Sequence, residues 1–147
     1  ESRLERERKK AKRLNLKNLI FQKLSSNKLK ILKNKEINLI YARFFLHAIN
    51  ETNENNFLNI IKKNFKANTT IALEFRTTKD VLRRKGKKIS KNERLTDHYR
   101  RFIDTDKFKK KLEKMKFKIL YIKQGINLSK SPNDNPHLCR IVFSRSY

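Results

Sequence analysis

The sequence predicts an α/β fold built on a mainly parallel sheet whose last strand is antiparallel. Across the 147 residues, segments with apolar residues at helical spacing alternate with short runs of β-branched and aromatic residues. Near the C-terminus, two such runs are joined by a short turn-rich link, which is typical of an antiparallel pair. This alternation favours helices packed over a mainly parallel sheet.

Four elements are expected before residue 50. In order, they are a charged helix over Ser2–Leu14, a short strand over Leu16–Leu24, a short helix from Ser25 through Asn34, and a buried strand over Glu36–Phe45. The first helix has only a thin apolar stripe, formed by Leu4, Ala11 and Leu14. Two serines, Ser25 and Ser26, are suited to capping the second helix.

The remaining elements form the better-defined part of the pattern. They are a helix over Asn50–Lys66, a strand over Thr69–Arg76, a helix from Asp104 or Thr105 to Met115, and strands over Phe117–Gln124 and Leu138–Ser144. Thr52 or Asn53 is the expected cap of the first of these helices. The residues expected to face the core are Phe57, Leu58, Ile60, Ile61, Phe65, Phe108, Leu112 and Met115. Residues 77–97 are polar and basic, and we expect a functional or mobile insertion loop there.

The length predicts one domain, residues 1–147, and because no signal peptide is visible a cytoplasmic protein is expected. Ten Phe and a 37% hydrophobic share support a core, while 39 Lys and Arg against 14 Asp and Glu give a net charge of +25. Nucleic acid would suit that charge, but Lys, Asn and Ile all have A/T-rich codons, so mutational bias is the favoured explanation. The single Cys139 excludes an internal disulfide, no zinc-site spacing occurs, and no run is long enough to span a membrane.

Charged residues follow two of the expected strands, and folding alone explains them poorly. The apolar run from Asn38 leads directly into Arg43 and His47, and the strand at Thr69 carries Glu74 and Arg76. Glu74 and Arg76 alternate with Phe75 and therefore share a face, where they can pair with each other or orient a ligand. Because ligands of open α/β sheets bind at the carboxyl ends of the strands, these four side chains are candidates for a site.

With these residues in hand, the chain resembles the C-terminal two-thirds of class I S-adenosylmethionine-dependent methyltransferases. Ile37–Ile49 is similar to the family's fourth strand and the loop that follows, although many members have Asp where Asn38 stands. Four further segments resemble the fifth strand, the entry to the next helix and the entries to the last two strands. They are Ala72–Arg76, His98–Ile103, and the pair Lys116–Lys118 and Asn135–Arg140.

The resemblance implies an incomplete Rossmann-like methyltransferase sheet with helices on both faces. The family's Gly-rich cofactor loop and ribose-binding carboxylate belong to its first two strands, which would precede Glu1, and Gly86 and Gly125 are the only glycines. We therefore expect an N-terminally truncated copy that binds S-adenosylmethionine weakly or not at all. By resemblance, the cofactor-binding residues are Ser25, Ala42 and Arg43.

The resemblance also assigns an acceptor side to the site. His98 is the best candidate for a general base, with His47 as a second catalytic candidate, because a histidine can take a proton from an attacking hydroxyl. The residues expected to bind substrate are Phe44, Glu74, Arg76, Tyr99 and Arg100. Four of the candidate residues also have a purely structural alternative. His98 can cap a helix and His47 can start one. Arg43 can be a surface ion-pair partner, and Ser25 can be a helix cap.

Three functions follow from these observations. The leading one is methyl transfer from S-adenosylmethionine to a small-molecule acceptor, with an anionic or glycosyl compound favoured. The second is a basic RNA-binding module that uses residues 83–91 and the first helix, for which affinity would fall steeply with salt. The third is a catalytically inactive partner subunit, which would expose an apolar edge where strands are missing.

Overall fold

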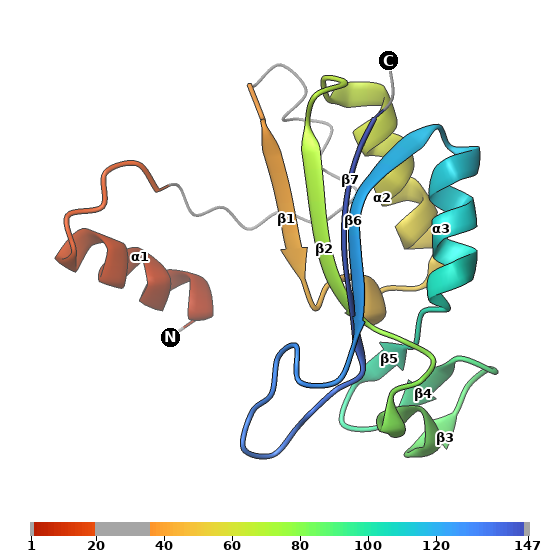
Figure 1. Cartoon of the computed structure of the whole chain (residues 1–147). Coiled ribbons are helices and arrows are strands. Elements are labelled where there is room, and N and C mark those ends of the chain that lie inside the picture. The colour runs from red at the N-terminus through yellow and green to blue at the C-terminus, as the bar shows by residue number, and fades with distance from the viewer. Residues whose placement is uncertain (1, 20–35, 146–147) are drawn as a thin grey trace.

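The computed structural model describes residues 2–19 and 36–145 (Figure 1). The main sheet has the order β1-β2-β7-β6 and the helices are α1, α2 and α3. The elements of this part are α1 (Arg3–Arg13), β1 (Leu39–Arg43), η2 (Leu46–Ala48), α2 (Glu51–Asn64), β2 (Thr70–Arg76), α3 (Thr105–Lys114), β6 (Phe117–Gly125) and β7 (Leu138–Arg145).

The strand directions confirm the predicted sheet. β1 pairs with β2 in parallel, whereas β7 is antiparallel to both β2 and β6. β1, β2 and β6 therefore share one direction, and the C-terminal strand β7 alone among them is reversed. The β6–β7 register shifts between Ile119 and Tyr121, which leaves Leu120 as an extra residue at a bulge.

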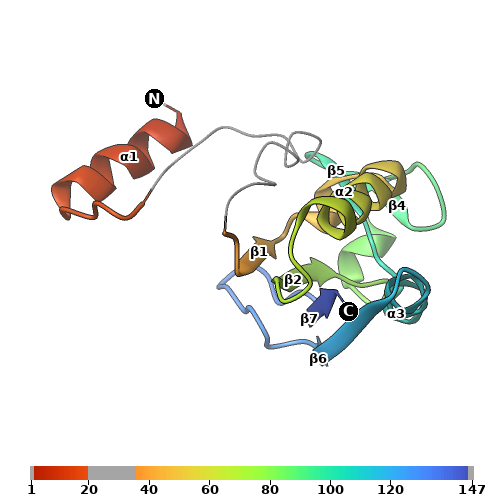
Figure 2. The same cartoon turned by 90° about the horizontal axis from the view of Figure 1, so that it is seen from above.

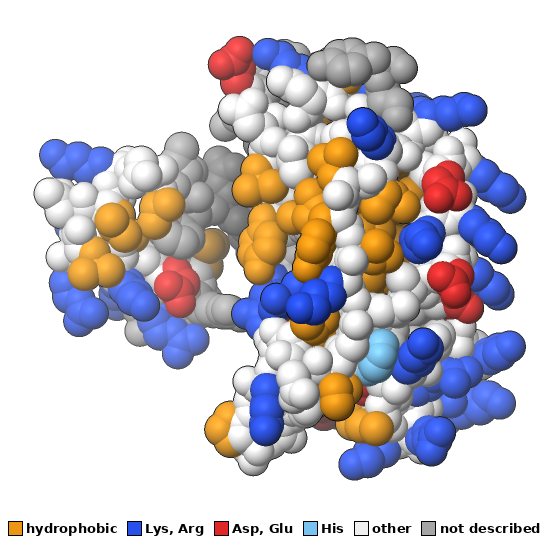
Figure 3. Space-filling model, in the orientation of Figure 1, with side chains coloured by type: hydrophobic (Ala, Val, Ile, Leu, Met, Phe, Trp, Pro, Cys, Tyr) orange, Lys and Arg blue, Asp and Glu red, His pale blue; other side chains and the backbone are white. Residues whose placement is uncertain are grey.

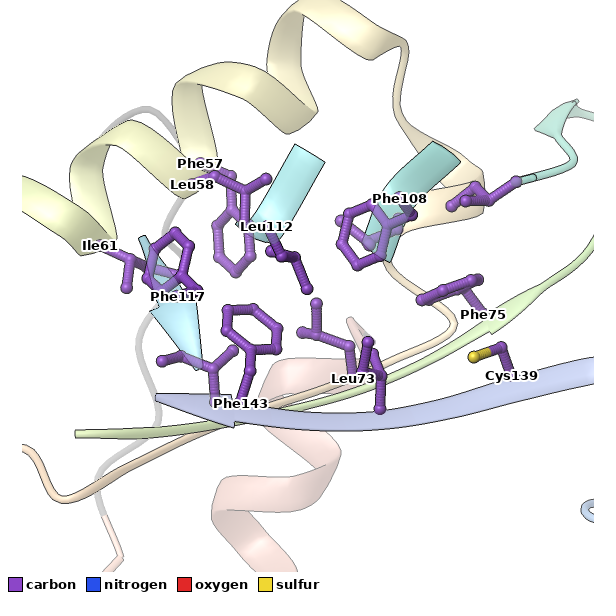
Figure 4. Packing of buried hydrophobic residues seen from close by; sticks show 14 of the residues in the cluster. Phe57, Leu58, Ile61, Leu73, Phe75, Phe108, Leu112, Phe117, Cys139 and Phe143 are labelled. Atoms are coloured by element: carbon purple, nitrogen blue, oxygen red, sulfur yellow. The ribbon is translucent and has the colours of Figure 1, made fainter. Parts of the chain in front are cut away.

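Helices α2 and α3 lie together on one face of this sheet (Figures 1 and 2). Their apolar residues meet those of β2 and β7 in one cluster, which Figure 4 shows from close by. Within it, Phe75 packs edge-to-face against Phe108 and Phe117 against Phe143, with ring centroids 5.3 and 5.1 Å apart. Because Phe75 of β2 is buried against the helices, its neighbours Glu74 and Arg76 point to the opposite face of the sheet.

The helix boundaries agree with the sequence pattern except at one cap. Asp104 caps α3 through Oδ1, as expected, but α2 is capped by Asn50 and not by Thr52 or Asn53. Asn50 has the extended backbone that a cap requires, and its Oδ1 accepts from the Asn53 N–H at 2.9 Å. Ile60 and Met115, predicted in the core, are only partly buried at its edge.

The opposite face of the sheet differs from the prediction of helices on both faces. Helix α1 stands apart from the sheet in Figures 1 and 2, and no helix in the described ranges packs against this face. As a result, Leu39, Tyr41 and Tyr121 are 57%, 66% and 49% exposed. Figure 3 shows hydrophobic side chains gathered over these strands. We call this surface the open face.

Residues 77–97, where a functional or mobile insertion loop is expected, include short helical and strand segments. They contain η3 (Val81–Arg84), β3 (Lys87–Lys88) and β4 (Glu93–Leu95), and β4 pairs with β5 (Tyr99–Arg101) to complete a three-stranded antiparallel sheet. Gly86 makes the tight entry to β3 possible: its φ is +76°, and a Cβ there would lie 2.6 Å from the Leu95 carbonyl oxygen. We call this unit the small sheet.

Two predicted elements fall wholly or partly outside the described residues. Residues 17 and 18 form a turn and residues 16–19 contain no strand, while the rest of Leu16–Leu24 and the helix from Ser25 lie outside the described ranges. Within those ranges, no helix has the length and hydropathy to cross a membrane, and no group of His, Cys, Asp and Glu is placed to hold a metal ion.

Candidate functional site

The candidate site lies at the carboxyl ends of β1 and β2. Because these strands are parallel and in register, their tips Arg43 and Arg76 reach the same edge of the sheet. The small sheet and the link between β6 and β7 lie at this edge as well (Figure 1). Segments that are far apart in the sequence therefore meet at the sheet edge where the candidate site residues are predicted.

A buried carboxylate at this edge holds two guanidinium groups. Glu74 accepts from Arg43 Nε at 2.7 Å and from Arg140 Nε at 2.6 Å. Burial works to raise the pKa of Glu74, but the hydrogen bonds from Arg140 and Arg43 outweigh it and lower the pKa. The two arginine side chains remain 45% and 43% exposed. This cluster carries a net positive charge at the surface.

Glu74 and Arg76 do not pair with each other. The two NH groups of Arg76 bind Asp80, at 3.0 Å, and Asp134. Asp80 also accepts from the backbone N–H groups of Leu82 and His137. Arg76 is thus committed to carboxylates that tie β2 to the small sheet and to the link before β7, and it has little capacity left for a ligand.

A hollow of about 540 Å³ borders the Glu74 cluster on the open face. The exposed rings of Tyr41 and Tyr121 flank it, and Ala72 and Val142 lie between them in the same cross-strand row. An apolar floor beside two guanidinium groups suits a flat or apolar ligand group.

His47 is buried in the turn η2, directly after β1. Its Nδ1 accepts from the Arg76 backbone N–H at 3.3 Å, and its ring packs edge-to-face against Phe44. Burial, with smaller contributions from Arg76 and Arg100, lowers the pKa of His47 from 6.5 to about 4. The imidazole is therefore neutral at pH 7, and because Nδ1 accepts, its proton is on Nε2.

Phe44 has a backbone conformation that is unusual for a residue with a side chain. Its φ is +54°, and its N–H donates to the Glu74 carbonyl at 2.9 Å, which extends the β1–β2 pairing by one residue. The Arg43 guanidinium lies 4.9 Å from the centre of its ring. Such strain concentrates at functional sites, and here it turns the chain sharply from β1 into η2. Ala42, the predicted cofactor contact, is partly buried beside it.

His98 lies on the surface and does not cap a helix. It precedes β5, its side chain is 55% exposed, and its Nδ1 lies 2.8 Å from Asp97 Oδ2. Hydrogen bonds from Arg100 and Thr96 hold the pKa of Asp97 far below its usual range, so the carboxylate is ionised and can orient the ring. A carboxylate-oriented histidine with an open Nε2 suits a general base.

The other two residues predicted near His98 already have partners. The Tyr99 hydroxyl donates to Glu93 at 2.5 Å, and burial together with this bond raises its pKa. Arg100 binds Asp97 at 2.5 Å and also Thr96. Ser25, the remaining predicted cofactor contact, lies outside the described residues.

Sequence reasoning missed a second buried cluster, which fastens the small sheet to the main domain. Glu54 on α2 binds Arg101 on β5 and, at 2.6 Å, Lys111 on α3. Arg101 also donates from Nε to the Ile49 carbonyl at 2.9 Å. A recess of about 350 Å³ borders this cluster. Nothing in the helical pattern marks Glu54, because a polar residue on an amphipathic helix is normally expected to face solvent.

Comparisons with known proteins point to one fold. No family model and no curated protein matches the sequence. Among solved structures, a SAM-dependent methyltransferase from Methanosarcina mazei is similar with a TM-score of 0.72 and 9% identity, over 97% of this chain and 76% of that one. One from Clostridium acetobutylicum has a TM-score of 0.70 and 12% identity, over 98% and 71%.

A third structure contains a bound ligand. The glycopeptide N-methyltransferase MtfA, complexed with S-adenosyl-L-methionine, matches with a TM-score of 0.52 and 8% identity over 78% of this chain and 56% of that chain. At these identities the likeness shows the fold alone, and it confirms the class I methyltransferase-like α/β fold predicted from the sequence.

Proposed function

We propose that this chain forms the acceptor side of an S-adenosylmethionine-dependent methyltransferase acting on an anionic or glycosyl small molecule. The observation that carries the proposal is the edge where β1 and β2 end. It brings Arg43, Phe44 and His47 together on a fold shared with methyltransferases. The positive Glu74 cluster beside them favours an anionic acceptor.

The described residues fit one end of the cofactor. Arg43 can bind a carboxylate such as that of the cofactor's methionine part, because its side chain is half-exposed. For the ribose end, no free carboxylate is found among the described residues of this edge: Glu74, Asp80 and Asp134 are all bound to arginines. Gly86 belongs to the small sheet and a Cβ at Gly125 would meet nothing, so neither provides a close backbone approach.

The chain's own residues would position the acceptor and accept its proton. When bound, S-adenosylmethionine supplies an electrophilic methyl group. His98 takes the hydroxyl proton at Nε2 while Asp97 holds Nδ1. Neutral His47 donates from Nε2 and helps to orient the reacting groups, and Phe44 excludes water beside it. Alignment of the reactants can provide most of the rate enhancement.

The first test is a ¹⁵N NMR titration of the full chain with S-adenosylhomocysteine. The amide signals of Ala42, Arg43 and His47 should shift, with a Kd nearer 1 mM than 1 μM because the ribose end is poorly held. Arg43→Gln should weaken binding about tenfold. Lys118→Gln is the matched control, since Lys118 is exposed on β6 and should leave the Kd unchanged. Shifts confined to other parts of the chain would contradict the proposal.

The second test measures transfer of a labelled methyl group from S-adenosylmethionine to mixed sugar phosphates and glycosides. His98→Asn should lower the rate by about 100-fold. An unchanged rate in His98→Asn would exclude His98 as the base.

A further inference from the structure

The small sheet carries three cations in a row on one of its faces. The register places Lys88 opposite Arg94 and Arg94 opposite Arg100. Residues directly opposite each other project to the same face, so these side chains form one line across three strands. We call them the cation row. The line on the other face is formed by Lys87, Leu95 and Tyr99.

Such a row is unfavourable unless something neutralises it, because like charges directly opposite one another destabilise a sheet. Lys88 is exposed and has no ion pair within the described ranges. Arg94 donates to the backbone carbonyls of Ser90, Lys91 and Glu93. Arg100 has one carboxylate partner, Asp97. Three positive charges and one negative charge leave a local charge of +2.

The two guanidinium groups of the row are fixed before any ligand arrives. Arg94 is bound into its own hairpin at 2.7 and 2.8 Å, and Arg100 is held by Asp97 at 2.5 Å with its side chain only 13% exposed. A site whose charges are already in place loses little conformational entropy on binding. The exposed Lys88 marks the accessible end of the row.

The row also lies close to the candidate active site. β5, which carries Arg100, packs against the turn η2 that carries His47. The charge of Arg100 is one of the causes that lower the pKa of His47. A ligand group bound by the row would therefore leave the rest of the molecule within reach of the strand tips.

We propose that the cation row binds a phosphate group of the acceptor. That the ligand is the acceptor rests on the proposed function, whereas the phosphate site rests on the row itself. A phosphate monoester carries a charge of about −1.5 to −2 at pH 7, which matches the local charge. A carboxylate would neutralise only half of it. Guanidinium and ammonium groups together supply the charged donors that phosphate oxygens accept.

Neighbouring lysines on β3 allow a sharp test. Lys88 belongs to the row, while Lys87 has the same charge and exposure but projects to the opposite face. Inorganic phosphate and glucose 1-phosphate would be titrated into the full chain and followed by ¹⁵N NMR. Lys88→Gln should weaken both about fivefold and Lys87→Gln less than about twofold. Affinity for inorganic phosphate should rise between about pH 6 and 8, as the dianion forms.

A 20-nucleotide RNA serves as the competing probe, because the small sheet has lysines on both faces. RNA binding that both variants weaken equally, with phosphate binding unchanged in Lys88→Gln, would overturn the phosphate site in favour of a general polyanion surface. Absence of phosphate binding would overturn it as well. These titrations contain no methyl donor. Failure of S-adenosylhomocysteine to bind would therefore count against the proposed function alone.

Discussion

Two buried glutamates of this chain each bind two cations, and the clusters differ in where those cations lie. Glu54 and Glu74 are 1% and 4% exposed. The partners of Glu54 are largely buried, with Arg101 at 11% and Lys111 at 25%, whereas the partners of Glu74 are half-exposed, with Arg43 at 45%. One cluster joins α2, α3 and β5; the other presents guanidinium groups at the sheet edge.

The difference shows how the same ion pairing can serve stability or binding. A cation that loses its partner in a buried cluster keeps an uncompensated charge, which is costly. A cation at the surface regains water and loses little. The Glu54 cluster should therefore respond to substitution mainly through stability, and the Glu74 cluster mainly through ligand binding.

The largest expected effect is that of Glu54→Gln. Removing the charge leaves Arg101 and Lys111 without their buried carboxylate, and we expect a loss of about 3 kcal/mol in the free energy of unfolding. Urea denaturation measures it. Glu51→Gln is the matched control, because Glu51 also binds Lys111 but is 67% exposed, and should cost less than about 1 kcal/mol. Equal losses of stability in the two variants would show that burial does not make Glu54 more important for stability than Glu51.

A similar effect should appear with pH through His47. Its pKa is about 4 in the folded protein, against 6.5 for an unperturbed histidine, so the unfolded chain takes up the proton first as the pH falls. Stability is retained above pH 6.5 and is lost as the pH falls from 6.5 toward 4, by about 3 kcal/mol.

The variant His47→Gln isolates this contribution. Gln can still accept from the Arg76 N–H but does not titrate, so its unfolding free energy should fall less over the same pH range. The contributions of Glu74 and the other carboxylates to the pH dependence are common to both proteins, so they cancel when the two unfolding free energies are subtracted. Parallel pH curves for the two proteins would show that His47 is not the group responsible.

Glu74→Gln should cost less than Glu54→Gln, about 1 to 2 kcal/mol. Arg43 and Arg140 can turn to solvent when the carboxylate charge is lost, but the amide that replaces it stays buried with fewer donors. Because the pKa of Glu74 is lowered, its contribution is present at neutral pH and is lost as the pH falls through its folded pKa. A loss as large as that of Glu54→Gln would remove the distinction between the clusters.

The sequence predicted the regular elements better than the contacts of charged residues. Helical and strand periodicity located α2, α3, β2, β6 and β7, because apolar burial dictates those spacings. It missed the small sheet, whose strands are two or three residues long and lack an apolar pattern.

The partners of charged residues could not be read in the same way. The pairing of Arg76 with Asp134 joins residues 58 positions apart, and nothing local specifies it. Arg43 and Glu74 were predicted as separate site residues, but their direct contact depends on the β1–β2 register. By contrast, the position of Arg43 and His47 at a strand tip followed from the local pattern of an apolar run that ends in polar residues.

The smallest effect on stability should come from the residue with the largest expected effect on ligand binding. Arg43→Gln removes an exposed guanidinium from Glu74, which keeps Arg140, so we expect a loss of only about 0.5 kcal/mol in urea denaturation. Arg101→Gln is the matched substitution in the other cluster. It should cost several times more, because Arg101 also holds the Ile49 carbonyl. When both variants are titrated with S-adenosylhomocysteine, Arg43→Gln should lower the affinity more than Arg101→Gln does. If Arg101→Gln lowered the affinity as much as Arg43→Gln, Arg43 at the end of β1 would be no more directly involved in ligand binding than the Glu54 cluster.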